Sequence, residues 1–519
     1  MSAALTETIP ELLAEAVAAG GDREALGAVE NGGIVWLSWR ELADTAARRA
    51  AALRRRGVLS GDRVAHLSGN CREWILADLA IQLVGGVHVP LHDALSPQQA
   101  VEQTLHAEAK LLLTNGSASA REAASRLAGT TSTATHAELA SEDQSDFTAP
   151  TLSGEDLATI LYTSGTTGAP LGVMLTQRNL VANARATCEM IASNAAETRL
   201  GVLPLSHIYA RTCDLYAWLC RGSRFVLAES RETFLRDCQL ARPTVLNAVP
   251  YFYQRIADGV RRQFGRVEEA ALRTVLGGRV KRCYCGGAPL DAETDRTFAA
   301  AGLPIMCGYG LSEASPVITM SNPENRVSGT VGQPLANLEV RLEADGEVLV
   351  RGPSVMRGYW RDEAATARAI ADGWLRTGDL GEWSVEGNLR IVGRKKELIV
   401  LATGKKAAPA AVEQLLCSSP LIEQACVVGD GRKYLAALIV PSEAALGEFA
   451  GSGHAKLETA LRVEIDHVMA AASHCEQIGR FAILPRGFSL ERGEVTPKHS
   501  LRRNAIALAF AEEIEQLYL

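Results

Sequence analysis

The chain has little of what marks a membrane, secreted or nucleic-acid-binding protein. No apolar run reaches the roughly 18 residues that a transmembrane helix needs, so none is expected. The start, from Met1 to Glu7, has neither the basic segment nor the apolar core of a signal peptide. The net charge of −7 excludes a broad basic surface for nucleic acid. We therefore expect a cytoplasmic protein, and loose contact with a membrane surface stays open.

The eleven cysteines lack a metal-binding pattern. The closest pair is Cys283 and Cys285, and no Cys-x-x-Cys or Cys/His spacing of a zinc site is present. Most cysteines are therefore expected to be small buried residues in a reducing compartment. What the chain does have is length: 519 residues, 47% of them hydrophobic, predict two or three structural units with large cores.

Helix-like and strand-like patterns alternate over residues 36–127, which favours a parallel α/β sheet. The expected elements there are helices over Trp39–Arg56 and Trp74–Val84 and strands over Val64–Leu67 and Val87–Leu91. Residues 128–157 have weak periodicity and are expected to form a surface excursion. The alternation resumes over residues 201–390.

The pattern changes around Gly393–Glu397, where a smaller unit begins. That unit is expected to contain strands over Ala425–Val428 and Tyr434–Val440 and a long helix over residues 454–472. The sequence thus predicts an α/β protein with an N-terminal domain over residues 1–394 and a C-terminal domain over residues 395–519.

The most distinctive motif is Thr163-Ser164-Gly165-Thr166-Thr167-Gly168, which lies between a strand-like run and a helix-like run that begins near Thr176. Its glycines let backbone N–H groups approach a phosphate closely, and its hydroxyls donate further hydrogen bonds. It is not a Walker loop, because the Gly-Lys-Ser/Thr ending is missing. Alone, such a cluster is usually a turn.

Two further segments fit a nucleotide site, although each alone is more often structural. His207 lies in the run Leu203–Tyr209 and by itself is more often a satisfied structural histidine. The turn Gly287-Ala288-Pro289 follows a strand-like run, and a flat turn of this kind can lie against an aromatic base.

Polar groups that suit ATP and magnesium follow later in the chain. Tyr309 can stack on a purine, Ser312 can donate to a phosphate, and Glu313 can bind Mg²⁺ through hard oxygen ligands. Asp379 can accept hydrogen bonds from both ribose hydroxyls. Arg394 can donate to the same sugar or to the α-phosphate.

Together and in this order, these segments resemble those of the adenylate-forming superfamily, which includes acyl-CoA synthetases, luciferases and peptide-synthetase adenylation domains. The resemblance covers nearly the whole chain. The segments similar to long-chain fatty acyl-CoA synthetases are Pro204–Arg211, Arg242–Thr244 with Val249-Pro250, and Gly429–Pro441. No carrier-protein domain follows, which argues against a peptide-synthetase module. The resemblance implies a large N-terminal adenylate-forming domain of stacked α/β sheets and a small mobile α+β C-terminal domain.

The resemblance also implies an acid–thiol ligase. Such an enzyme uses ATP and Mg²⁺ to activate a carboxylic acid, here expected to be a fatty acid, as acyl-adenylate, and then forms a thioester with CoA as co-substrate. The residues implied to bind the nucleotide are Thr163, Ser164, Gly165, Thr166, Thr167, Gly168, Gly287, Ala288, Pro289, Tyr309, Gly310, Ser312, Asp379 and Arg394.

Catalytic positions are implied in the same way. His207 lies near the carboxylate and the acyl entrance, Glu313 binds Mg²⁺, and Lys396 lies at the hinge between the domains. The segment Ala402–Lys406 moves in for thioester formation. Lys498 is the candidate for the catalytic lysine near the C-terminus.

Two positions depart from the family pattern. Leu171 stands where the phosphate loop has a lysine, and Ser500 stands where the family has the lysine that bridges the carboxylate and the α-phosphate. Losing a positioned cation at a developing charge commonly costs about 10²–10³-fold in rate, so adenylation is expected to be weakened. Lys498 substitutes only if its loop slips in register or bends.

Two alternatives therefore stay open. The first is a catalytically impaired homologue that binds nucleotide or acyl-adenylate and acts as a partner or regulator. The second is an enzyme that passes the acyl group to an amine or a carrier protein instead of CoA. Neither the acid nor the oligomeric state can be read from the sequence.

Overall fold

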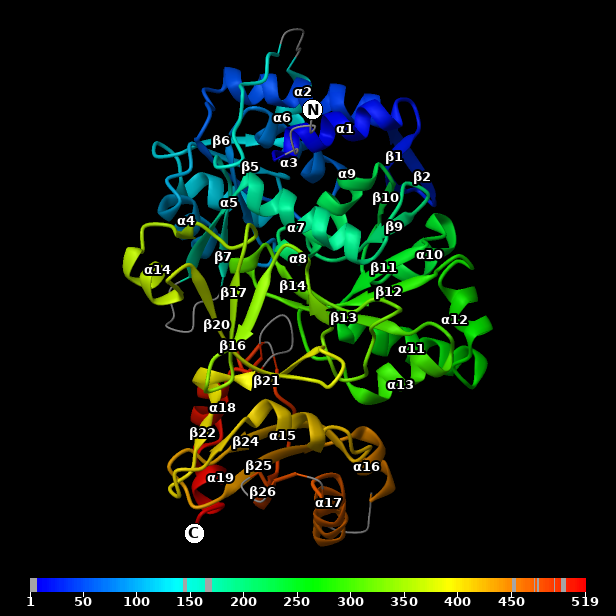
Figure 1. The fold of residues 1–519 in the computed structure, drawn as a ribbon, viewed down its shortest axis with the longest axis vertical. Coiled ribbons are helices and arrows are strands. Elements are labelled where there is room, and N and C mark those ends of the chain that lie inside the picture. The colour runs from blue at the N-terminus through cyan, green and yellow to red at the C-terminus, as the bar shows by residue number, and fades with distance from the viewer. Residues whose placement is uncertain are drawn as a thin grey trace.

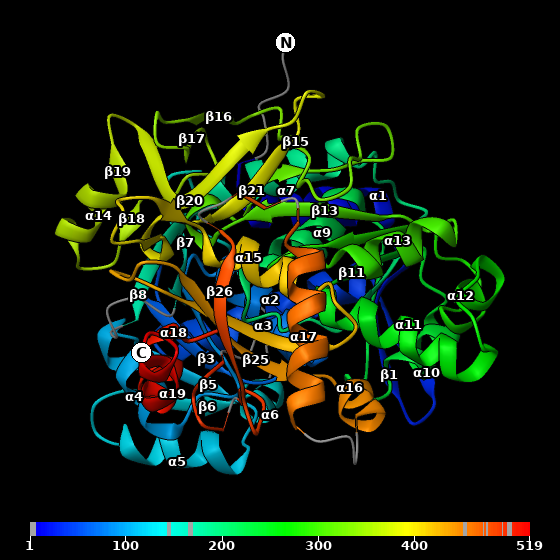
Figure 2. The ribbon, with the colours of Figure 1, turned by 90° about the horizontal axis from the view of Figure 1, so that it is seen from below.

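The computed structural model describes residues 7–142, 147–163, 170–449, 454–470, 472–473, 476–489, 491–495 and 501–519. Figure 1 shows a large unit above and a smaller unit below. The chain passes from the large unit to the small one near β21. Figure 2, seen from below, shows the small unit lying across the middle of the large one. The predicted α/β class, with a large N-terminal and a smaller C-terminal part, is confirmed.

A seven-stranded sheet of the large unit runs in the order β18-β8-β7-β4-β3-β5-β6. Its strands from β7 to β6 are parallel, as predicted, whereas β8 pairs antiparallel with both β7 and β18. The strands are β3 (Arg63–Leu67), β4 (Val87–Leu91), β5 (Leu111–Thr114), β6 (Ser132–Thr135), β7 (Leu157–Thr163), β8 (Leu171–Thr176) and β18 (Gly358–Tyr359).

A nine-stranded sheet runs in the order β15-β14-β13-β12-β11-β9-β10-β1-β2. It is parallel from β13 to β1 and antiparallel at both edges. The strands are β1 (Glu24–Glu30), β2 (Gly33–Ser38), β9 (Thr198–Gly201), β10 (Arg224–Leu227), β11 (Val245–Ala248), β12 (Arg282–Cys285), β13 (Ile305–Gly310), β14 (Val317–Met320) and β15 (Gln333–Pro334).

A five-stranded sheet completes the large unit and lies next to the small one (Figure 1). Its strands are β16 (Glu339–Leu342), β17 (Glu347–Arg351), β19 (Ile370–Ala371), β20 (Trp374–Trp383) and β21 (Leu389–Arg394). The strands of the small unit are β22 (Ile399–Val400), β23 (Lys406–Ala407), β24 (Ile422–Val428), β25 (Leu435–Pro441) and β26 (Ile478–Ile483).

Several helices begin at a residue whose side chain caps the first turn. Before α2, Ser38 accepts a hydrogen bond from the Glu41 N–H while the Glu41 carboxylate accepts one from the Ser38 N–H, which stabilises the first turn. The helices are α1 (Ile9–Gly20), α2 (Trp39–Arg55), α3 (Arg72–Leu83), α4 (Pro97–His106), α5 (Ala118–Arg126), α6 (His136–Ser141), α7 (Gln177–Met190), α8 (Ile208–Ala210), α9 (Ala217–Arg221), α10 (Phe234–Ala241), α11 (Pro250–Phe264), α12 (Glu269–Val275), α13 (Ala292–Ala300), α14 (Glu363–Ala369), α15 (Pro409–Leu416), α16 (Glu443–Glu448), α17 (His454–Val468), α18 (Arg503–Ala509) and α19 (Ala511–Gln516).

The prediction for residues 128–157 is wrong in part. The segment contains strand β6, which pairs in parallel with β5, and helix α6, whose first turn is capped by Thr135 and Glu138. Strand β6 is Ser-Thr-Ala-Thr at the edge of its sheet, and only Ala134 is buried. A strand with one buried residue gives no apolar periodicity, so the pattern did not reveal it.

The buried cores of the two units are separate. Around α1, α2 and α9, the rings of Trp39 and Trp218 stack at 4.7 Å between centroids in the core of the large unit. The core of the small unit gathers buried side chains of α15, α17 and β24–β26. Each unit therefore buries its own apolar residues against its own elements.

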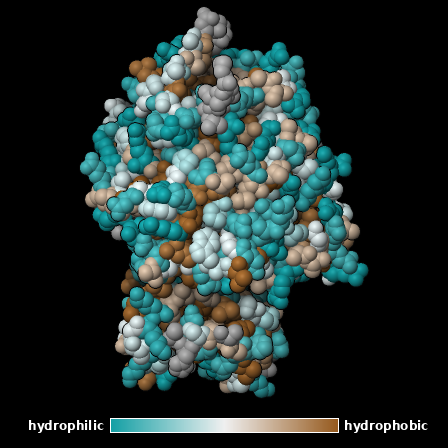
Figure 3. All heavy atoms as spheres, in the orientation of Figure 1, coloured by the Kyte–Doolittle hydropathy of each residue, from teal (hydrophilic) through white to brown (hydrophobic). Residues whose placement is uncertain are grey.

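Hydrophilic residues cover most of the face drawn in Figure 3, and hydrophobic ones are spread over it. Within the residues that the structure describes, we find no helix with both the length and the apolarity to cross a bilayer.

Candidate active site

The strands on either side of the predicted phosphate loop form one hairpin. In β7 and β8, Tyr162 pairs with Gly172 and Thr163 pairs with Leu171. A Cβ at Gly172 would lie 2.9 Å from the Ile160 Cγ2, so this close approach of the strands needs glycine. The loop itself, Ser164, Gly165, Thr166, Thr167 and Gly168, lies outside the described residues. Its phosphate contacts stay a prediction.

The run that carries His207 is fixed at its start by Asn70. The Asn70 amide donates to the Leu203 carbonyl at 2.7 Å and accepts from the Leu205 N–H at 2.8 Å. His207 then caps α8, and its carbonyl accepts from the Arg211 N–H at 3.0 Å. The half-buried His207 ring thus stands at the entry of a short helix whose start is held by a side-chain amide.

The turn after β12 lies against this run. A Cβ at Gly286 would lie 3.2 Å from the Tyr209 Cζ, so the Tyr209 ring packs directly on the Gly286 backbone. Gly287 has φ +83°, a conformation that favours glycine. The structure therefore brings the predicted turn Gly287-Ala288-Pro289 and the His207 run together.

Three predicted nucleotide residues meet at one carboxylate. The Tyr309 hydroxyl donates to the Asp379 Oδ2 at 2.7 Å, and the Arg394 Nε lies 3.0 Å from the Asp379 Oδ1. Strands β20 and β21 place Asp379 and Arg394 opposite each other. Burial raises the pKa of the Asp379 carboxyl, while the Arg394 guanidinium and the Tyr309 hydroxyl oppose that rise. The cluster joins β13, β20 and β21 around a buried acceptor.

Glu313 lies in a single 3₁₀ turn, Ser312–Ala314, directly after β13. The turn requires Gly310, because a Cβ there would lie 1.9 Å from the Pro316 carbonyl oxygen. The Glu313 Oε1 accepts a hydrogen bond from the Tyr359 hydroxyl at 2.8 Å. Among the described residues, no Lys, Arg or His forms a salt bridge with this carboxylate. A half-buried carboxylate without a cationic partner is a fitting ligand for Mg²⁺.

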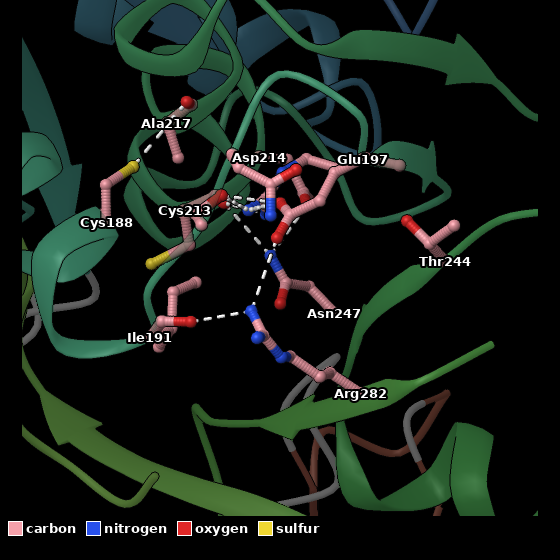
Figure 4. Close-up of polar contacts among 12 residues, drawn as sticks. Cys188, Ile191, Glu197, Cys213, Asp214, Ala217, Thr244, Asn247 and Arg282 are labelled. Atoms are coloured by element: carbon pink, nitrogen blue, oxygen red, sulfur yellow. Dashed lines mark hydrogen bonds and ion pairs between the residues drawn. The ribbon is translucent and has the colours of Figure 1, made fainter.

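A buried polar network anchors the segment after His207 (Figure 4). Asn247 on β11 donates to the Asp214 Oδ1 at 2.6 Å and to the Cys213 carbonyl at 3.0 Å. Arg199 on β9 donates to the same carbonyl at 3.0 Å and to the Glu197 carboxylate at 3.1 Å. Burial raises the pKa of Asp214 to about 7, against the lowering by Arg199 and by the Asn247 hydrogen bond. The network ties this segment to two strands of the nine-stranded sheet.

Residues on the two sides of the predicted hinge form ion pairs with different units. The Lys395 ammonium lies 2.6 Å from Asp345 and 2.8 Å from Glu347, both in the large unit. Glu397 instead lies 3.5 Å from Arg503 in the small unit. The change of partner falls at Lys396, which is the residue predicted at the hinge.

The remaining predicted positions belong to the small unit. Residues Ala402–Lys405 lie in the turn of the β22–β23 hairpin and Lys406 begins β23; within the turn the Leu401 N–H donates to the Lys405 carbonyl at 2.9 Å. Lys498 and Ser500 lie outside the described residues, so the position of the candidate catalytic lysine stays a prediction.

Two family profiles match the chain. The AMP-binding enzyme profile matches residues 13–360, and the profile of the AMP-binding enzyme C-terminal domain matches residues 396–519. The chain belongs to the AMP-binding enzyme family. The resemblance drawn from the motifs is thereby confirmed.

Curated AMP-binding relatives cover most of the chain. The long-chain-fatty-acid–CoA ligase FadD15 of Mycobacterium bovis is 35% identical over 89% of this chain and 89% of its own length. The peroxisomal long chain acyl-CoA synthetase 7 of Arabidopsis thaliana is 29% identical over 93% of this chain and 81% of its own.

Solved structures share the fold of this chain. The O-succinylbenzoate CoA synthetase MenE of Bacillus subtilis, in complex with AMP, is 26% identical with a TM-score of 0.80, and covers 95% of this chain and 97% of its own. MatB of Rhodopseudomonas palustris with bound ATP has a TM-score of 0.82 at 24% identity, covers 97% of this chain and 99% of its own, and shows the fold alone.

Reasoning from the sequence of this AMP-binding enzyme missed two residues at the site. Asn70 holds the His207 run and Tyr359 holds Glu313, although each is far from its partner along the chain. Asn70 lies in the loop between β3 and α3, and Tyr359 is placed by the pairing of β18 with β8, so neither contact has a local signal in the sequence.

Proposed function

We propose that this AMP-binding enzyme activates a carboxylic acid, a fatty acid in the first instance, as acyl-adenylate and then forms a thioester with CoA. The observation that carries the proposal is the cluster of Tyr309, Asp379 and Arg394, which joins three strands around one buried carboxylate. The names of the curated relatives support the fatty acid and CoA as substrates.

In this proposal the residues of the chain bind and orient the nucleotide. Asp379 accepts from the ribose hydroxyls, and Arg394 donates to the sugar or the α-phosphate. The Gly287–Pro289 turn and Tyr309 hold the adenine, and Ser312 donates to the α-phosphate. The loop Thr163–Gly168 encloses the β- and γ-phosphates through backbone N–H groups and hydroxyls.

Glu313 would hold Mg²⁺. When bound, the ion offsets negative charge on the phosphates as the acid attacks. Glu313 suits this role because, among the described residues, its side chain hydrogen-bonds to the neutral hydroxyl of Tyr359 through one oxygen, which leaves the second oxygen for a cation. His207 would lie near the carboxylate and the acyl entrance.

We also propose that the N-terminal domain covers residues 1–394 and that the C-terminal domain, 395–519, turns about Lys396 between the two half-reactions. The separate cores and the change of ion-pair partners between Lys395 and Glu397 support this boundary. Domain closure keeps water away from the reactive mixed anhydride. The movement would bring the Ala402–Lys406 turn to the thioester site.

The test is ATP–pyrophosphate exchange with fatty acids of short, medium and long chain, together with detection of acyl-CoA when CoA is added. We expect exchange with at least one acid and CoA-dependent release of AMP. Absence of both exchange and acyl-CoA with every acid would contradict the proposal. Acyl transfer to an amine or a carrier protein, with no thioester on CoA, would favour the second alternative.

One observation favours an impaired homologue as a second candidate. Leu171 begins β8 opposite Thr163, so an apolar side chain stands at the exit of the phosphate loop where the family has a cation. Ser500 removes the second cation. In that case the chain binds ATP or acyl-adenylate, and exchange is slow with every acid.

A further inference from the structure

Tyr359 connects Glu313 to the strand that leaves the phosphate loop. It lies in β18, where it pairs antiparallel with Val173 of β8. Its backbone N–H donates to the Thr366 Oγ1 at 2.8 Å, so α14 also holds it. The Tyr359 main chain is therefore fixed by two independent contacts before its side chain makes any.

The Tyr359 hydroxyl forms a hydrogen bond with one carboxylate oxygen of Glu313. It donates to Oε1 at 2.8 Å, and the Met356 N–H donates to the Glu313 main-chain carbonyl, also at 2.8 Å. The segment Met356–Tyr359 thus holds both the backbone and the side chain of Glu313.

We propose that Tyr359 is a positioning residue for the metal. Its hydroxyl donates a hydrogen bond to the Glu313 Oε1. Glu313 would then bind Mg²⁺ through Oε2 alone, with its carboxylate held in one orientation. The inference rests on the proposed function, because it takes Glu313 as the metal ligand. Mg²⁺ demands near-octahedral geometry and usually accepts one or two carboxylate oxygens beside phosphate oxygens and water. A hydrogen bond from an outer residue orients such a ligand and prevents it from turning to bind through both oxygens.

The position of Tyr359 also couples the metal to the phosphates. Strand β8 continues directly from the loop that is proposed to enclose the β- and γ-phosphates, and Tyr359 is paired with its third residue, Val173. A metal ligand held from this strand keeps a constant position relative to the strand.

The experiment measures ATP binding to the full chain by isothermal titration calorimetry, once with Mg²⁺ and once with EDTA. We expect Mg²⁺ to strengthen binding to the wild type and Tyr359→Phe to lose about 10- to 100-fold of the affinity for MgATP. Binding of metal-free ATP should not change, because the hydroxyl contacts Glu313 and not the nucleotide. Tyr434→Phe is the matched control, since it removes a tyrosine hydroxyl bonded to the Leu517 carbonyl at 2.7 Å in the small unit.

A double-mutant cycle with Glu313→Gln separates positioning from general destabilisation. In the Glu313→Gln background, Tyr359→Phe should cause no further loss of MgATP affinity. Equal losses of MgATP and metal-free ATP affinity in Tyr359→Phe would overturn the inference, and so would unchanged MgATP affinity. If Mg²⁺ strengthens binding to neither the wild type nor any variant, the assignment of Glu313 in the proposed function fails, and the inference fails with it.

Discussion

At the scale of single residues, Asp379 is the acceptor on which the nucleotide site depends. Both of its oxygens already have partners, Tyr309 on one and Arg394 on the other. Each oxygen has a second lone pair, so the ribose hydroxyls can bind while both partners stay. The two partners therefore orient the carboxylate for the sugar.

We expect Asp379→Asn to raise the KM for ATP, because an amide loses the charge-assisted hydrogen bonds. Hydrogen bonds to a charged group are worth about 1.5–3 kcal/mol, so the rise should be about 10- to 100-fold. The measurement is initial rate against ATP concentration. Glu382→Gln is the control, because it removes a carboxylate from the same strand pair, 3.0 Å from Arg390 and away from the cluster. An unchanged KM in Asp379→Asn would exclude the ribose role.

The two missing lysines can be tested directly. We expect Ser500→Lys to raise the rate of ATP–pyrophosphate exchange by about 10²–10³-fold, because it restores a cation at the developing charge. Leu171→Lys should add a smaller gain at the phosphate loop, and Leu171→Met, which keeps the residue apolar, should add none. If the wild type already exchanges as fast as the double lysine variant, the impaired alternative is wrong and the departures are tolerated.

At the scale of elements, a buried chain of histidines joins α3 to the centre of the seven-stranded sheet. Asp78 on α3 accepts from the His88 Nδ1 at 2.6 Å and pairs with Arg211 at 2.5 Å. The His88 Nε2 lies 3.1 Å from the His66 Nδ1, and the His66 Nε2 lies 2.8 Å from the His136 Nε2. Because the ionised Asp78 can only accept, each neutral ring must donate toward Asp78 and accept from the next ring. The hydrogen bonds thus fix the tautomers of the three neutral rings.

These buried histidines make the stability of the fold sensitive to acid. Burial lowers the pKa of His88 and of His136 from 6.5 to about 4, and Arg211 lowers that of His88 further while Asp78 opposes the change. The histidines take up protons near pH 6.5 in the unfolded chain but only near pH 4 in the folded chain. Their contribution to the free energy of unfolding is therefore fully present above pH 6.5 and is lost as the pH drops toward 4. Between these two pH values, each of these histidines lowers the free energy of unfolding by about 1.4 kcal/mol per pH unit.

We expect urea unfolding at pH 7 and pH 5 to show this loss, and His136→Gln to show less of it. Glutamine can replace the hydrogen bond to His66 and does not titrate. The difference between the wild type and the variant removes the contribution of carboxylates, which both proteins share. A variant that loses as much stability as the wild type between the two pH values would contradict the assignment of His136.

The elements also show how much of the fold could be predicted from the sequence. Helix α2 and strands β3 and β4 were predicted within a residue or two, because α2 is amphipathic and the short apolar strands alternate with helices along the chain. The cluster around Asp379 follows from motifs, whereas the contact from Tyr359 to Glu313 depends on the pairing of β18 with β8. Long-range strand pairing has no local signal, so residues placed by it are found only in the structure.

At the scale of the whole molecule, the chain consists of two cores joined by a short linker. Four buried clusters lie between Ile9 and Leu389, and two lie between Ile399 and Leu517. The strand β21 ends at Arg394, and the next core residue is Ile399. Across the linker, the Gln414 side-chain amide donates to the Leu290 carbonyl at 3.4 Å, and Ala408 packs closely on Gly393 of β21. No buried cluster of the described residues includes residues of both units, which suits a domain that turns.

Two thermal transitions should follow from this arrangement, measured by differential scanning calorimetry. Leu461 in α17 is fully buried in the small core and Leu272 in α12 is fully buried in the large unit, so each Leu→Ala change should cost about 2–5 kcal/mol in its own unit only. MgATP should raise the transition that Leu272→Ala lowers, because the proposed nucleotide residues belong to the large unit, and binding stabilises the folded state that it selects. A single transition that both variants lower by similar amounts would show that the two cores unfold together. The units would then be coupled through more than the linker, and rotation about Lys396 would have to break that coupling in every turnover.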